Sequence, residues 1–138
     1  SNNHNLNEEE TNNSTKEVIE TKKSDVKVTD IKVIINNKTY ILELENNKAV
    51  EEFITLLPQE FNMKELNGNE KYVYMDKSLT TNSYGSKHIE KGDVMLYGNN
   101  CLVIFYKSFD TSYSYTKIGH IDNLEDLGTK DILARFEK

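Results

Sequence analysis

Tyrosine is the residue type in this chain with the clearest capacity for ligand recognition. Of the eight tyrosines in the 138-residue sequence, seven lie between residues 72 and 115. A tyrosine combines a broad apolar face with a polar hydroxyl and loses little conformational entropy when it is held, so it is common in binding surfaces. The same tyrosines could also pack on the outside of a sheet. Two interpretations therefore stay open: a tyrosine-lined groove and an ordinary aromatic exterior.

Histidine and cysteine are scarce, which limits the metal and nucleophilic chemistry available to the chain. The histidines are His4, His88 and His120, and their spacing with the carboxylates matches no metal-ligand motif. Cys101 and His120 could form a nucleophile pair in principle. However, Cys101 lies in an apolar run with no electropositive neighbour to lower its pKa, which favours the role of a small buried hydrophobe. No glycine-rich loop suggests a phosphate-bearing group. We therefore expect no metal and no cofactor.

The charge balance argues against nucleic acid as a partner. The formal net charge is -6, whereas a nucleic-acid binder needs a basic stripe to replace phosphate counterions. No run of lysine and arginine offers a patch for an anionic membrane. No apolar stretch approaches the roughly 20 residues of a membrane span.

The first 25 residues differ in composition from the rest of the chain. Residues 1–24 contain only three aliphatic side chains, and the remainder are mostly Asn, Glu, Ser, Thr and Lys. Such a segment cannot bury enough apolar surface to offset the entropy of ordering it. We therefore predict a disordered acidic tail over residues 1–25 and a folded domain over residues 26–138. A polar arm of this kind is typical of an exported or cell-surface lipid-anchored protein, and the alternative is the disordered terminus of a cytoplasmic protein.

Eight short strands are predicted in the folded part, from alternating or continuous apolar residues bounded by turn signals. They span residues 28–35, 39–44, 60–66, 71–75, 93–97, 101–106, 117–121 and 131–136. The pairs Asn36-Asn37 and Asn67-Gly68 tolerate positive φ and predict tight hairpins. The strand 101–106 is apolar on both faces, which suits a central strand buried on both sides.

One amphipathic helix is predicted from Lys48 to Leu57. Val50, Phe53, Ile54 and Leu57 follow a helical spacing, an asparagine precedes the segment as an N-cap, and a proline follows it. A single helical turn is also predicted over residues 123–127. Eight hairpin-connected strands with one or two short helices favour a closed β-barrel, because an open sheet would leave edges to protect.

Two irregular segments lie between the predicted strands. Residues 76–91 show no consistent periodicity, and residues 109–115 form a polar, aromatic loop. Because a long structureless stretch in a compact domain is often functional, the candidate binding loops are residues 76–91 and 107–116.

Several motifs, taken in order, resemble the bacterial cyclophilin-like family. They are the stretch from Lys91 to Tyr106, the stretch from Tyr115 to Ile121, the helix end Leu56-Leu57-Pro58 and the turn from Leu66 to Tyr72. The resemblance covers about residues 30–137. It implies a mostly-β fold, an eight-stranded cyclophilin-like β-barrel with one or two short helices. It also implies a family whose members are often exported or lipid-anchored and mostly lack an assigned activity.

The resemblance does not extend to the catalytic residues of prolyl isomerases. Those cyclophilins polarise the prolyl amide with an arginine, surrounded by phenylalanine, glutamine, tryptophan and histidine. The resemblance places Phe105 near the groove, but Tyr115 stands where the histidine would be, and the glutamine and tryptophan are missing. The one arginine, Arg135, lies in the last predicted strand, where the family pattern has no catalytic group.

The sequence thus favours a non-catalytic module that binds a peptide or a small ligand. The alternative is a weak peptidyl-prolyl isomerase that lacks the usual arginine. Membrane contact is expected only through a lipid anchor ahead of Ser1, and no oligomeric state is predicted. The candidate ligand-binding residues are Tyr72, Tyr74, Tyr84, Phe105, Tyr113 and Tyr115.

Overall fold

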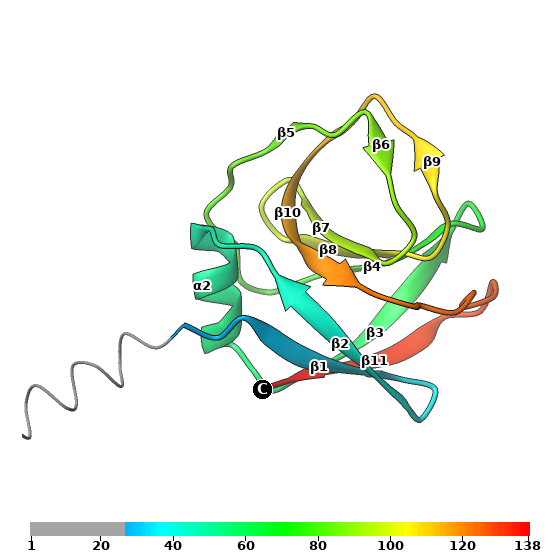
Figure 1. Cartoon of the computed structure of the whole chain (residues 1–138), viewed down its shortest axis with the longest axis horizontal. Coiled ribbons are helices and arrows are strands. Elements are labelled where there is room, and N and C mark those ends of the chain that lie inside the picture. The colour runs from blue at the N-terminus through cyan, green and yellow to red at the C-terminus, as the bar shows by residue number, and fades with distance from the viewer. Residues whose placement is uncertain (1–26) are drawn as a thin grey trace, which may run out of the picture.

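The computed structural model describes residues 27–138, and its helix and strands are labelled in Figure 1. The tail predicted for residues 1–25 lies outside the described residues. The helix is α2 (Lys48–Thr55). The strands are β1 (Asp30–Ile35), β2 (Lys38–Leu44), β3 (Gln59–Leu66), β4 (Glu70–Tyr74), β5 (Tyr84–Gly85), β6 (His88–Ile89), β7 (Asp93–Tyr97), β8 (Cys101–Phe105), β9 (Phe109–Asp110), β10 (Ser114–Ile121) and β11 (Ile132–Glu137).

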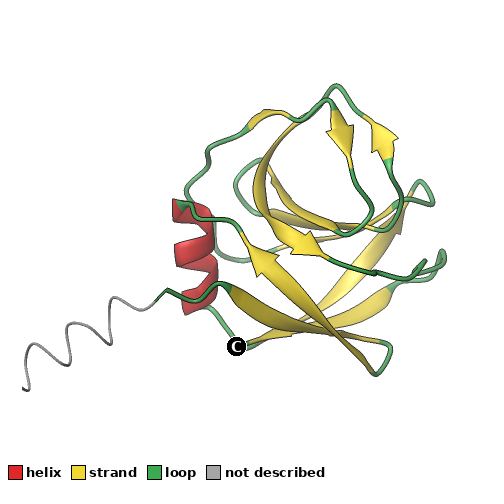
Figure 2. Cartoon of the chain, viewed as in Figure 1, coloured by secondary structure: helices red, strands yellow, loops and turns green. Residues whose placement is uncertain are grey.

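Eight of these strands close into a barrel. Figure 2 shows their curved sheet as yellow arrows. The strand order is β2-β1-β11-β3-β4-β8-β7-β10, and β10 pairs with β2 to complete the ring. All neighbouring pairs are antiparallel. The predicted eight-stranded barrel is therefore confirmed, and its strands are the eight that the apolar alternation indicated.

Gly119 allows the barrel to close. This residue pairs with Val94 of β7 on one side and with Leu44 of β2 on the other. The register with β7 shifts between Lys117 and Gly119, which marks a β-bulge that bends β10. A Cβ atom at position 119 would lie 2.1 Å from the carbonyl oxygen of Glu43, so only glycine lets β2 approach this closely.

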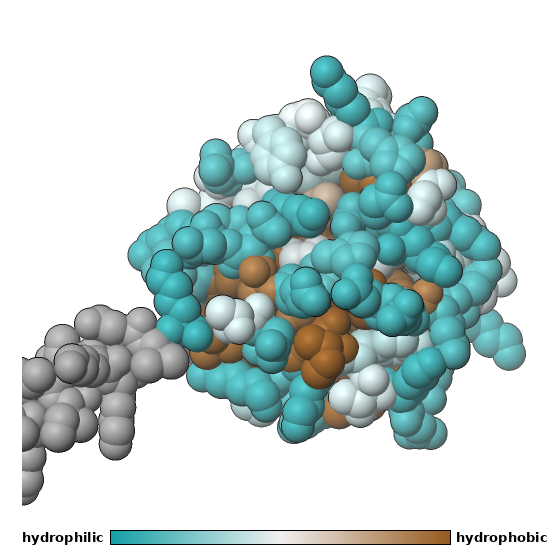
Figure 3. All heavy atoms as spheres, in the orientation of Figure 1, coloured by the Kyte–Doolittle hydropathy of each residue, from teal (hydrophilic) through white to brown (hydrophobic). Residues whose placement is uncertain are grey.

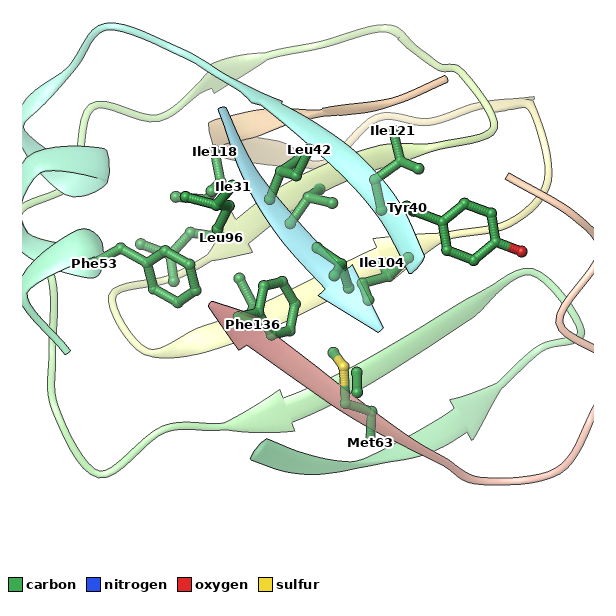
Figure 4. Packing of buried hydrophobic residues seen from close by; sticks show 14 of the residues in the cluster. Ile31, Tyr40, Leu42, Phe53, Met63, Leu96, Ile104, Ile118, Ile121 and Phe136 are labelled. Atoms are coloured by element: carbon green, nitrogen blue, oxygen red, sulfur yellow. The ribbon is translucent and has the colours of Figure 1, made fainter. Parts of the chain in front are cut away.

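The barrel interior is filled by aliphatic and aromatic side chains, shown in Figure 4. Phe53 of α2 is fully buried and points into this interior, where its ring meets Phe136 edge-on at a centroid distance of 5.6 Å. The Asn47 side chain caps the helix by accepting a hydrogen bond of 2.9 Å from the Val50 backbone N–H. The helix ends at Thr55, two residues before the predicted end.

A second hydrophobic cluster lies on the outer face of β7 and β8. Leu102 and Ile104 belong to the interior core, whereas Cys101, Val103 and Phe105 belong to the outer cluster. The outer cluster is completed by residues from the loops, Ile89 and Phe109 among them. This arrangement confirms that strand 101–106 is buried on both faces, and it shows that the loops cover the outer one.

The two irregular segments contain short strands. β6 pairs with β9, and these two strands lie side by side in Figure 1. Ile89 of β6 and Phe109 of β9 pack in the outer cluster on β7 and β8. β5 pairs with the start of β10, through Tyr84 and Tyr115. Residues 114 and 115, predicted to be loop, therefore belong to β10, because the polar segment gains a partner strand from residues 84–85.

The helical turn predicted over residues 123–127 is wrong. Asn123 has a φ of 60°, which lies outside the right-handed helical region, and residues 124–128 are not helical. Leu124 is nevertheless buried, so the segment is packed without being helical. The Lys71 ammonium also binds the carbonyl oxygens of Gly128 and Lys130, each at 2.6 Å, which holds the segment in an irregular path.

Polar side chains cover most of the surface in the view of Figure 3, and hydrophobic atoms emerge mainly beside α2 and across β1 and β2. Within residues 27–138, no helix has the length and apolar character needed to cross a membrane.

Candidate functional site

A pocket of about 280 Å³ lies on the outer face of the barrel, next to the outer hydrophobic cluster. Its lining comes from the end of β3, from β4, β7, β8 and β10, and from the loop before β10. The lining residues are Leu66, Glu70, Tyr72, Tyr74, Tyr97, Cys101, Val103, Tyr113 and Tyr115. We call this the tyrosine pocket.

Strand alternation explains one wall and the floor of the tyrosine pocket. Glu70, Tyr72 and Tyr74 stand two residues apart on β4, so their side chains project to the same face of the sheet. On β8, Val103 pairs with Tyr72 and Cys101 pairs with Tyr74. The two β8 side chains are nearly fully buried and form the floor beneath the tyrosines.

The opposite wall is built from three tyrosines that pack on one another. The Tyr97 ring lies 6.0 Å from the Tyr113 ring and 5.8 Å from the Tyr115 ring, measured between centroids. Tyr115 in turn packs edge-on against the buried Phe105 ring at 5.5 Å. Such ring contacts add to the stability gained by burial and hold the wall in place.

The pocket has a deep floor and an exposed rim. Tyr115 is 5% exposed, whereas Tyr74 and Tyr113 are 65% and 60% exposed. Leu66 and Tyr97 are also exposed at the rim. A contiguous exposed apolar surface around a concave site is typical of a binding surface.

Glu70 is the one charged side chain in the pocket lining. Burial, with a smaller contribution from the nearby Glu65 carboxylate, raises the pKa of Glu70 above its ordinary value. Burial also raises the pKa values of Cys101 and Tyr115, and the Glu70 charge adds to both shifts. Burial therefore favours the protonated thiol of Cys101, which is the less nucleophilic form.

Four of the six predicted site residues line the pocket: Tyr72, Tyr74, Tyr113 and Tyr115. Phe105 lies beneath Tyr115 and supports it without lining the pocket. Tyr84 is exposed on β5 and also does not line the pocket. Tyr97 and Glu70 were not among the six predicted residues. The alternation of Glu70 with Tyr72 and Tyr74 was the available signal for the carboxylate.

The histidines of the described residues lie in other places. The His88 ring nitrogens contact Asp110 at 2.7 Å and Glu90 at 2.8 Å, and the Asp110 hydrogen bond is the main cause of its raised pKa. His120 contacts the buried Asp93 at 2.8 Å and does not line the pocket beside Cys101. Within residues 27–138, no three His, Cys, Asp or Glu side chains are grouped to hold a metal ion.

The arginine does not line the tyrosine pocket. Arg135 lies on β11, between β1 and β3, and its Nε donates to the Glu137 carboxylate at 3.0 Å. Lys71, which lies between Glu70 and Tyr72 on β4, is fully buried on the face away from the pocket. Neither side chain supplies a positive charge inside the pocket.

A protein-family model described as the cyclophilin-like family matches residues 33–137. No curated protein and no solved structure matches the chain significantly.

Proposed function

The chain belongs to the cyclophilin-like family, and from this premise we propose that it is a non-catalytic module that binds a peptide or a small ligand in the tyrosine pocket. The observation that carries the proposal is the pocket itself, five tyrosines around one carboxylate on the outer wall of the barrel. Rigid tyrosines around a largely pre-formed cavity are a common means of recognition.

The pocket is poorly suited to polarising a prolyl amide. The arginine of prolyl isomerases is a cationic hydrogen-bond donor, and no arginine or lysine side chain of residues 27–138 lines the tyrosine pocket. Arg135 does not line the pocket and contacts Glu137 instead. Weak isomerisation remains the alternative function, and the family membership is its support.

A nuclear magnetic resonance titration tests the proposal. The full chain, labelled with ¹⁵N, is titrated with a synthetic pool of random-sequence hexapeptides. We expect the largest shifts at amides of β4, β8 and residues 113–115. Tyr74→Ala and Tyr113→Ala should weaken the response, because both side chains form the exposed rim.

Tyr84→Ala is the matched control. Tyr84 is similarly exposed, at 51%, but it does not line the pocket, so its loss should leave the titration unchanged. Shifts that centre on Tyr84, or that are absent with the whole pool, would overturn the binding function at this pocket.

A further inference from the structure

Glu70 is a half-buried carboxylate without a partner of its own in the described part of the chain. No hydrogen bond or ion pair of its side chain occurs among residues 27–138, although most other carboxylates near the loops are paired. The charged group that affects the Glu70 pKa is another carboxylate, Glu65, which raises it further. Partial burial disfavours the charged form of this carboxylate, and a cationic group bound in the pocket would offset that cost.

The aromatic rings around Glu70 suit the same kind of ligand. The ring face of a tyrosine carries negative potential and attracts ammonium and guanidinium groups that lie within about 6 Å of its centre. Tyr72 and Tyr74 stand on one side of the pocket and Tyr97, Tyr113 and Tyr115 on the other. A cation between the two walls would meet ring faces and the carboxylate together.

The rim indicates what the cation is attached to. The exposed large hydrophobic side chains of the described residues include four that lie at this pocket, namely Leu66, Tyr74, Tyr97 and Tyr113. A small free cation would fill the cavity and leave this rim in water. A peptide would cover the rim with the residues on either side of the one that enters the pocket.

The overall charge favours the same partner. The net charge of -6 attracts basic segments and repels acidic ones at long range. Charge, aromatic walls and rim thus favour a single class of occupant, a basic peptide.

Resting on the binding function proposed above, we propose that the tyrosine pocket binds the lysine or arginine side chain of a peptide, with the cationic group against Glu70 and the peptide backbone across the tyrosine rim.

The test uses four capped heptapeptides that differ only in the central residue, which is lysine, arginine, norleucine or glutamate. Affinities for the full chain are measured by the same NMR titration. We expect the lysine and arginine peptides to bind at least about tenfold more tightly than the norleucine peptide, and the glutamate peptide to bind least. Glu70→Gln should reduce the preference for lysine over norleucine to the part that the tyrosine rings supply, while leaving the norleucine affinity in place.

Glu60→Gln is the matched control, because Glu60 is an exposed β3 carboxylate that does not line the pocket. It changes the net charge by the same amount, so it should leave the lysine preference intact. If both variants lost the lysine preference equally, the preference would come from long-range attraction only. That result would overturn cation binding at Glu70. Equal binding of all four peptides at the pocket would overturn the inference and leave the binding function standing.

Two further outcomes separate the remaining cases. If the random hexapeptide pool shifts the pocket amides but none of the four heptapeptides does, the cationic specificity is wrong and the binding function stands. If the pool also gives no shift, both are wrong. Binding of tetramethylammonium or of N-acetyl-lysine methylamide as tightly as the lysine heptapeptide would overturn the peptide as the source of the cation.

Discussion

The Lys71 ammonium lies 2.9 Å from the Glu65 carboxylate, in a site where the lysine side chain is 0% exposed and the glutamate side chain 16% exposed. All three protons of the ammonium are used, since the carbonyl oxygens of Gly128 and Lys130 accept the other two at 2.6 Å. The Tyr106 hydroxyl donates to the same Glu65 carboxylate at 2.6 Å. Burial and this carboxylate raise the Tyr106 pKa, so the hydroxyl stays a donor. The network joins β3, β4 and the 128–130 segment behind the tyrosine pocket.

Lys71→Met should destabilise the fold by about 3–5 kcal/mol, because it leaves a largely buried carboxylate and two carbonyl oxygens without their partner. Urea denaturation of the full chain measures the change. The control is Lys38→Met, which removes the ammonium from an ion pair whose side chains are 50% and 66% exposed. That loss should cost about 1 kcal/mol or less. Equal effects of the two substitutions would show that Lys71 has no special structural role.

Phe53→Ala should cost about 3–5 kcal/mol, since it empties a fully buried site in the barrel interior and removes the edge-on contact with Phe136. A thermal melt reports the loss directly. Leu133→Ala is the control, because Leu133 is 59% exposed on β11 and should change stability by about 0.5 kcal/mol or less. A shift of only a degree or two for Phe53→Ala would show that the helix does not contribute to the core.

Gly92→Ala and Gly98→Ala separate steric exclusion from backbone preference. Both glycines have positive φ, at 101° and 60°. A Cβ at position 92 would lie 2.1 Å from the Ile121 carbonyl oxygen, whereas one at position 98 meets nothing within 4 Å. We expect Gly98→Ala to cost about 1–2 kcal/mol and Gly92→Ala more than about 3 kcal/mol, measured by urea denaturation. Similar costs would mean that β7 and β10 can separate without penalty.

The local pattern of the sequence was sufficient to predict the eight barrel strands, but not the short strands β5, β6 and β9. Within the predicted strand 28–35, Val33 and Ile35 alternate with more exposed neighbours and point into the core. The closure at Gly119 could not be predicted, because it depends on how near β2 and β10 approach in space. The burial of Lys71 could not be predicted either. A lysine in a strand is ordinarily solvated, and this one is buried against carbonyl oxygens nearly 60 residues away in the sequence.

The candidate site was predictable in part for the same reason. Residue type alone predicted four of the site residues that the structure brings together, Tyr72, Tyr74, Tyr113 and Tyr115. Glu70 has a residue type that is usually solvent-exposed, so it was not predicted, although its alternation with Tyr72 and Tyr74 on β4 places it on the same face. Tyr84 is also a tyrosine, but it does not line the pocket, because it is exposed on β5, which pairs with the start of β10.

Glu70→Gln should stabilise the protein at neutral pH. The folded state raises the Glu70 pKa above its ordinary value, so the folded state prefers the protonated form. Such a group contributes full stability below its unfolded pKa, and this contribution is lost as the pH rises through the higher folded pKa. Urea denaturation at pH 7 should therefore show the glutamine variant to be the more stable. The difference should vanish as the pH falls below the ordinary glutamate range.

Glu60→Gln provides the comparison, because that carboxylate is exposed on β3. Its stability should stay within about 0.5 kcal/mol of the parent chain at both pH values. If Glu70→Gln is less stable than the parent chain at pH 7, the Glu70 carboxylate has a stabilising partner. That result would also argue against a cation-binding site at Glu70.

We expect this domain not to accelerate prolyl isomerisation at the rate of a typical cyclophilin. The uncatalysed rotation must cross a barrier of about 18–20 kcal/mol, and an enzyme lowers it by stabilising the twisted amide with a placed donor. Removing one such donor costs about 10²–10³ in rate. Here the pocket presents Glu70, and Arg135 does not line it. A protease-coupled assay over a series of prolyl peptides measures the rate, with Glu70→Gln as the informative variant because it exchanges an acceptor for a side chain that can donate. Acceleration comparable to that of a cyclophilin, abolished by Arg135→Ala or Phe105→Ala, would overturn the binding-module function and establish an enzyme.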